Sequence, residues 1–218
     1  MEDANADRSL IAPSALTPPA GTFTFTNYEI FWLTGSYSPT DNLQITLGTA
    51  VPLTRDQPFL GTLGAKLQIV KSDRLRLALH GTIGGGSEGG SGGGAGIVGG
   101  ALTYCLDEGC ISRLNGYVGA GFAFENNAAS PILASGAAIF RLGNRLRGLV
   151  ELDTGYIAGD FASTSNTFLF NYALRFTGPN VGVDFGFMKL FVDGEDVLDE
   201  VPLGIPFVSF TYRGGPRF

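Results

Sequence analysis

The stretch NLQITLGTA, residues 42–50, alternates large apolar side chains with polar or small ones. Leu43, Ile45 and Leu47 share one parity, and successive side chains of a β-strand point to opposite faces. The pattern is typical of a half-buried strand in a soluble sheet. It is equally typical of a strand with lipid on one side and water on the other. The composition of the two faces distinguishes these media.

The same alternation recurs along the chain. It covers residues 60–70, 74–83, 112–124, 145–156, 167–176 and 181–188. The polar face is mainly Gly, Thr, Asn and Arg, and charged residues make up only 16% of the chain, against about 25% in ordinary soluble domains. Aromatic residues gather near the expected strand ends, as in the girdles of membrane barrels. These residues are Tyr37, Tyr104, Phe140, Tyr156, Phe176 and Tyr212. We therefore expect the leucines of 42–50 to face lipid, with a soluble lipocalin-like barrel as the alternative.

No apolar run approaches the roughly 20 residues that a membrane-spanning helix needs. The mean hydropathy is +0.18, and the longest candidate, FTFTNYEIFWL, is interrupted by Asn27 and Glu29. The first 21 residues lack the basic start and apolar core of a signal peptide. We expect residues 1–20 to form a flexible periplasmic segment whose signal sequence has been removed. Residues 21–218 are expected to form a single barrel domain.

Counting the segments favours an all-β, antiparallel, up-and-down transmembrane β-barrel of 12 strands. Ten strands are expected at 42–52, 60–70, 74–84, 96–105, 111–124, 131–141, 145–157, 166–176, 180–190 and 204–213. Residues 22–38 add two more if they form a hairpin, whereas one long strand there would give eleven. Even numbers are the rule for single-chain bacterial barrels, so twelve is preferred and ten is the fallback.

Tight turns and longer connections alternate in this layout. Short turn signals rich in Gly, Pro, Asn and Asp lie at 38–42, 70–74, 105–110, 141–145 and 176–180. Between them lie longer connections, including a Gly/Ser tract at 84–96 that we expect to be a flexible loop. Outer-membrane barrels have short periplasmic turns and longer outer loops. Both termini are therefore expected on the tight-turn side.

The last segment, PFVSFTYRGGPRF, resembles the aromatic-rich terminal strand of outer-membrane barrels, which ends in Phe. It departs from that pattern in the interposed GGPR. The segments GTFTFTNYEIFWLTGSYSPTDNLQITLG and LRFTGPNVGVDFGFMKLF resemble poorly characterised outer-membrane proteins of myxobacteria and Bacteroidota. The resemblance implies an outer-membrane location and a barrel fold. The partners expected of such a barrel are the bilayer, lipopolysaccharide and the barrel assembly machinery. The resemblance implies no reaction.

The two cysteines, Cys105 and Cys110, flank an expected turn. A disulfide across a hairpin neck is geometrically plausible, and the periplasm permits one. A metal pair is the alternative, but the chain offers no other cysteine and one distant histidine. We therefore expect a disulfide, no metal and no cofactor.

The single histidine, His80, has the inward parity of its strand. An outer-membrane hydrolase could use it as a base with Thr82 or Ser87 as nucleophile. No motif of such an enzyme is present, and a wall histidine bound by hydrogen bonds explains it equally well. The expectation is that the chain is not an enzyme. The Gly/Ser tract lacks the Lys-Ser/Thr of a phosphate-binding loop.

Basic residues concentrate on the inward parity, mostly close to the tight turns, while acidic residues gather in the long connections. The expected lumen-lining charges are Lys66, Arg74, Arg76, Arg113, Arg145, Arg147, Glu151, Asp153, Arg175 and Asp184. Rings of charge set the selectivity of pores, so one expectation is a narrow channel or transporter for small, anionic solutes. The other is a closed structural or adhesive barrel. In it the arginines pair with Glu151, Asp153 and Asp184, and the acidic loops bind a partner or cations. Nothing supports nucleic-acid binding.

Overall fold

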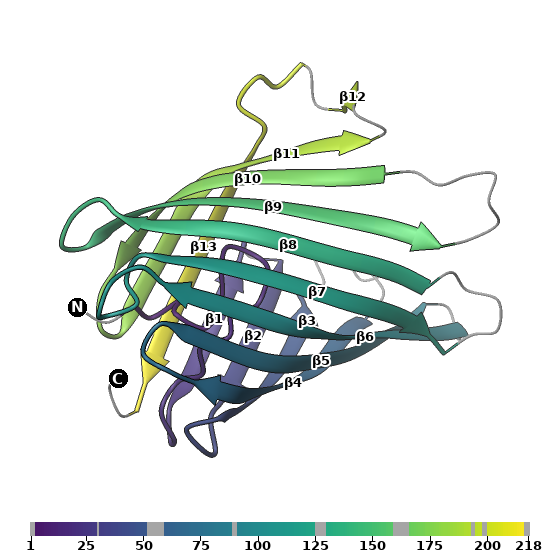
Figure 1. Ribbon diagram of the computed structural model, residues 1–218. Coiled ribbons are helices and arrows are strands. Elements are labelled where there is room, and N and C mark those ends of the chain that lie inside the picture. The colour runs from purple at the N-terminus through teal and green to yellow at the C-terminus, as the bar shows by residue number, and fades with distance from the viewer. Residues whose placement is uncertain are drawn as a thin grey trace.

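The computed structural model is an antiparallel β-barrel (Figure 1). It describes residues 3–29, 31–51, 59–88, 91–124, 130–158, 166–192, 195–197 and 200–215. The barrel strands are β1 (Phe23–Tyr28), β2 (Trp32–Tyr37), β3 (Leu43–Ala50), β4 (Phe59–Lys71), β5 (Leu75–Glu88), β6 (Ser91–Cys105), β7 (Arg113–Ala123), β8 (Ser130–Arg141), β9 (Leu146–Ala158), β10 (Asn166–Thr177), β11 (Val181–Val192) and β13 (Ile205–Gly214). Each pairs with its neighbours in sequence, and β1 pairs with β13 to close the ring.

The described residues thus confirm twelve barrel strands, including the hairpin expected within 22–38. A further two-residue strand, β12 (Glu195–Asp196), pairs only with β11. Both described chain ends lie at the end of the barrel that carries the tight turns (Figure 1). The described part of the chain has no helix that is both long and apolar enough to cross a membrane.

The alternation of side chains places the apolar face outside. In β7, Arg113, Asn115 and Tyr117 are buried inside the barrel, while Leu114 and Val118 are exposed. The same alternation holds in β4 and β11. The barrel exterior is therefore apolar and its interior polar, as the parity of the sequence predicts.

The Gly/Ser tract differs from the expectation of a flexible loop. Apart from residues 89–90, which lie outside the described residues, it extends β5 and β6 as paired strands, with Gly84 opposite Ala95. A Cβ added at Gly94 would lie 2.6 Å from the ring of Phe124, the residue that follows the neighbouring strand β7. Glycine at position 94 therefore permits a close approach of Phe124. The glycine-rich composition alone indicates a flexible loop instead.

The N-terminal segment also differs from its expectation. Residues 3–20 are not a free periplasmic segment but fold back into the barrel (Figure 1). The side chain of Leu10 is fully buried and packs against inward apolar residues of the wall, among them Ile139 and Leu149. Ala15 packs in a second cluster with Ala78 and Ala101. Burial of this apolar surface stabilises the docked segment. We call residues 3–20 the plug.

Candidate functional site

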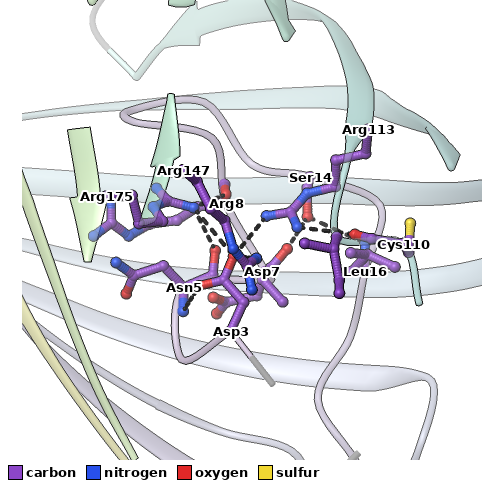
Figure 2. Close-up of polar contacts among 12 residues, drawn as sticks. Asp3, Asn5, Asp7, Arg8, Ser14, Leu16, Cys110, Arg113, Arg147 and Arg175 are labelled. Atoms are coloured by element: carbon purple, nitrogen blue, oxygen red, sulfur yellow. Dashed lines mark hydrogen bonds and ion pairs between the residues drawn. The ribbon is translucent and has the colours of Figure 1, made fainter. Parts of the chain in front are cut away.

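Three wall arginines converge on one carboxylate of the plug (Figure 2). Arg113, Arg147 and Arg175 come from β7, β9 and β10, close to the tight turns, and we call them the arginine cluster. Their guanidinium nitrogens lie 3.2, 2.6 and 3.6 Å from Asp3 Oδ2, respectively. All four side chains are buried. The lower lumen therefore contains a buried cationic site filled by the chain's own carboxylate.

Asp184 is the centre of a second group of polar contacts between the wall and the plug. Its side chain is fully buried, and Arg175 Nε donates to Asp184 Oδ1 over 2.6 Å. From the plug, Arg8 Nη2 lies 3.0 Å from Asp184 Oδ2, and Asn5 Nδ2 donates to Oδ1 over 3.2 Å. Asp184 thus pairs with an arginine, as the closed-barrel reading expects. It does so while also binding the plug.

Glu151 contacts the plug backbone. Its carboxylate accepts hydrogen bonds from the amides of Leu10, Ile11 and Ala12 over 2.5, 3.0 and 2.9 Å. Charge-assisted hydrogen bonds of this kind are stronger than neutral ones. The expected pairing of Glu151 with a wall arginine is therefore replaced by contacts to plug amides. Asp153 instead accepts a hydrogen bond from Asn171 Nδ2 over 2.8 Å.

Lys66 holds the plug from the opposite wall. Its ammonium group donates to the carbonyl oxygens of Asp7 and Leu16 over 2.9 and 2.6 Å. Gln44 Nε2 donates to Asp7 Oδ2 over 2.6 Å. The plug is consequently attached to several strands, and most of these attachments are polar.

The plug carboxylates are stabilised in their charged form. Burial acts to raise the pKa of Asp3, but the charges of Arg175, Arg113 and Arg147 outweigh it and hold that pKa well below its usual range. Burial likewise acts to raise the pKa of Asp7, while Lys66 is the strongest of the groups that lower it, and the balance is a lowered value. Both groups therefore carry the negative charge that the basic wall requires.

Of the remaining residues expected to line the lumen, two are exposed at the turns and one lines a cavity. Arg74 and Arg145 are exposed at the tight turns and do not join the arginine cluster. Arg76 is half-buried and lines a cavity at the tight-turn mouth. Cys105 and Cys110 form the expected disulfide. The acidic loop residues Asp56, Glu125, Asp160, Asp193 and Asp199 lie outside the described residues.

The structure brings His80 into contact with Thr82, one of the two nucleophiles proposed for a hydrolase. Its Nδ1 lies 3.4 Å from the hydroxyl of Tyr117, and its Nε2 lies 3.2 Å from Thr82 Oγ1. Within the described ranges no serine or carboxylate hydrogen-bonds to it, and no cluster of metal-ligating residues occurs there. The side chain of Ser87, the other proposed nucleophile, lies outside the described residues. That the chain is not an enzyme stays a prediction.

The charges of the wall and the plug complement each other. Among the wall side chains that the structure describes, five basic ones are buried, namely Lys66, Arg113, Arg147, Arg175 and Arg213. The buried acids of the described wall are Glu151 and Asp184, with Asp153 half-buried. The plug supplies Asp3 and Asp7 to this basic surface. The excess of inward arginine is the signal in the sequence that an acidic partner is needed, and an N-terminus beginning MEDANAD provides it.

Comparison with known proteins yields structural likeness alone. No family model and no curated protein matches the chain. Among solved structures, the outer-membrane-expressed OmpT of Vibrio cholerae aligns with a TM-score of 0.48 at 9% identity, over 84% of this chain and 64% of that one. LpxR from Salmonella typhimurium aligns with a TM-score of 0.48 at 11% identity, over 88% of this chain and 99% of that one.

A third structure, the Y282R/D307H variant of OccD1 (OprD), aligns with a TM-score of 0.44 at 13% identity, over 88% of this chain and 64% of that one. This chain spans less than two thirds of the OmpT and OccD1 chains. All three are outer-membrane β-barrel proteins. Likeness of this degree carries no argument about function, and the barrel assignment rests on the strand pairing of the chain itself.

Proposed function

We propose that the protein is an outer-membrane β-barrel that acts as a narrow channel for small anionic solutes, held closed by its plug. The observation that carries the proposal is the convergence of Arg113, Arg147 and Arg175 on Asp3. With the plug displaced, these arginines would line a polar lumen, and arginines stay charged at physiological pH. Charged rings between low-dielectric walls favour passage of the opposite charge.

The apolar exterior supports the membrane location. Large side chains are exposed all round the described barrel wall, including Leu47 at 62% and Val118 at 60% of their surface. An exposed apolar surface of this extent is unfavourable in water and suited to lipid. The proposed partners are the bilayer, lipopolysaccharide and the barrel assembly machinery, in keeping with the resemblance of the sequence to outer-membrane proteins of myxobacteria and Bacteroidota.

A permanently closed structural barrel is the second candidate. It is favoured by Leu10, whose side chain is fully buried among Ile139, Leu149, Ala173 and Phe207. Complete burial of one leucine contributes about 1.5–3 kcal/mol to docking of the plug. The polar attachments of the plug favour a reversible closure instead, because ions and amides released from the wall can be rehydrated.

The membrane location predicts a cost for charge on the exterior. Val118 lies midway along β7 and faces outward, opposite Gly100 and Ala134 on the neighbouring strands. Val118→Arg is expected to destabilise the folded barrel in liposomes by about 2–4 kcal/mol if the site lies near the bilayer midplane. Urea titration followed by the fluorescence of Trp32, the only tryptophan, measures the change. Val118→Leu is the control, and equal stability of the two variants would contradict a lipid-facing exterior.

The gating proposal predicts that Asp3→Asn opens the channel. The substitution keeps the size of the side chain but leaves three buried guanidinium groups without their shared carboxylate. Every 1.4 kcal/mol lost from docking raises the unplugged population about tenfold, and unpairing a buried ion costs more than that. Planar-bilayer recordings are therefore expected to show openings at least about tenfold more frequent than in the parent.

The matched control is Asp73→Asn, which removes a carboxylate from an exposed tight turn. Reversal potentials across a salt gradient are expected to show a preference for anions in the open state. A cation preference, or the same opening frequency in the parent, Asp3→Asn and Asp73→Asn, would overturn the proposed function.

A further inference from the structure

A cavity at the tight-turn mouth borders the arginine cluster directly. Its volume is about 560 Å³, and Asp3, Arg113 and Arg147 form part of its lining. The same two arginines bind the plug carboxylate. A small solute in this cavity would therefore meet the groups that hold the plug closed.

Two further cations line the cavity. Lys71 at the end of β4 and Arg76 in β5 are opposite each other in the strand register. Like charges directly opposite in a sheet destabilise it. Neither forms an ion pair with a carboxylate among the described residues. Asp41 and Glu108 also line the cavity, and Asp41 Oδ1 already accepts a hydrogen bond from the amide of Ala20.

The arginine cluster has more donors than Asp3 uses. A single oxygen, Asp3 Oδ2, faces all three guanidinium groups, while Asp3 Oδ1 accepts the amide of Asn5. Nε of Arg113, a side chain 1% exposed, has no hydrogen-bond partner in the described part of the chain. Guanidinium groups bind carboxylates and phosphates through two parallel hydrogen bonds. Arg113 Nη1 already donates to the carbonyl of Cys110, and the nitrogens of Arg175 donate to Asp184 and to plug carbonyls. An anion with several oxygens can therefore engage Arg113 Nε together with the nitrogens that Asp3 releases when it withdraws.

We infer that this cavity is a binding site for a small oxyanion, a carboxylate or phosphate, which competes with Asp3 for the arginine cluster and releases the plug. Asp3 acts as an internal stand-in for that ligand. Lys71 and Arg76 attract the anion to the mouth, and Arg113 and Arg147 bind it once Asp3 withdraws. The inference rests on the proposed function, because release of the plug by the bound anion would open the proposed channel. Because the anion and Asp3 exclude each other, each weakens the binding of the other by the same factor.

Calorimetric titration of inorganic phosphate and of acetate into the folded full-length protein in lipid nanodiscs tests the site without requiring conductance. Asp3→Asn removes the competitor and is expected to tighten phosphate binding about tenfold or more. The double variant Lys71→Ser/Arg76→Ser, made on the parent chain, is expected to weaken it about tenfold. Arg74→Ser, in the exposed turn beside the cavity, is the matched control and is expected to bind as the parent does.

Binding with this pattern of variants supports the site, even when bilayer recordings stay silent, in which case only the channel is overturned. Anion-selective openings without measurable phosphate or acetate binding in either the parent or Asp3→Asn overturn the site and leave the channel standing. Equal affinity of the parent and Asp3→Asn also overturns the inference, since competition with Asp3 is its central element. If Arg74→Ser weakens phosphate binding as much as the double variant does, the effect comes from surface charge in general and the inference of a cavity site is overturned.

Discussion

A chain lacking residues 3–20 is expected to fold into the same barrel and to give single-channel steps far more often than the parent chain does. The strands pair around the complete ring without any contribution from the plug, so the deletion removes no ladder hydrogen bond. It removes Asp3 and Asp7 from a wall whose buried charge is mainly basic. The uncovered arginines repel one another at close range and draw water and anions into the lumen.

The anion preference of the deletion variant is expected to depend on salt. The Debye length falls from about 30 Å at 0.01 M to about 3 Å at 1 M, so the preference fades over that range. Replacing Arg113, Arg147 and Arg175 by Ser in the deletion background is expected to abolish it. A peptide of residues 3–20 added to the tight-turn side is expected to block the current. A folded deletion variant that never conducts would support the closed structural barrel instead.

Asp184→Ala is expected to produce the largest loss of stability among single substitutions of the wall. The carboxylate pairs with Arg175 and Arg8 and also accepts hydrogen bonds from Asn5 and Ser209, with no exposed surface. Removing one partner of a buried ion pair leaves an uncompensated charge and costs about 3–5 kcal/mol. Urea unfolding in liposomes, followed by Trp32 fluorescence, measures the loss.

Two further variants show which partners of Asp184 cause the loss of stability. Asp184→Asn keeps the hydrogen-bonding shape and is expected to cost less than Asp184→Ala. In the chain lacking residues 3–20, where Arg8 and Asn5 are absent, Asp184→Ala is expected to cost less than it does in the parent, because fewer partners depend on it. An equal cost in both backgrounds would show that Asp184 acts through the wall alone.

The barrel itself could be predicted from the sequence because lipid and water impose a two-residue period on every strand. Val118 beside Tyr117, or Leu114 beside Arg113, already indicates which side chain faces outward. The ends of the strands are harder to predict from the sequence. The tract around Gly94 has the composition of a linker, yet its glycines allow Phe124 to pack closely against a strand. Composition does not distinguish a flexible glycine from one that permits close approach.

Of the two parts of the site, the wall residues could be predicted from the sequence and the plug residues could not. Parity places Arg113, Arg147, Arg175 and Asp184 inward, and the structure finds all four in one buried network. Parity and nearness to a turn also predict Arg74 and Arg145 as members of this group, because the sequence does not give the path of a side chain. The sequence alone does not place residues 3–20 in this network. No periodicity marks residues 3–20, since an irregular segment is held by contacts distant in sequence such as Leu10 to Glu151.

A disulfide trap tests whether the plug lies inside the barrel of the folded protein. The amide of Ala15 donates to Thr103 Oγ1, whose side chain is buried in the lumen, whereas the neighbouring Leu102 faces outward. Ala15→Cys is combined with Thr103→Cys or with Leu102→Cys, in a background with Cys105→Ser and Cys110→Ser, in intact membranes. Rapid, near-complete cross-linking to position 103 and only background cross-linking to position 102 is the predicted result. Equal, slow cross-linking to both positions, with position 15 open to membrane-impermeant thiol reagents, would show that the plug does not lie inside the barrel.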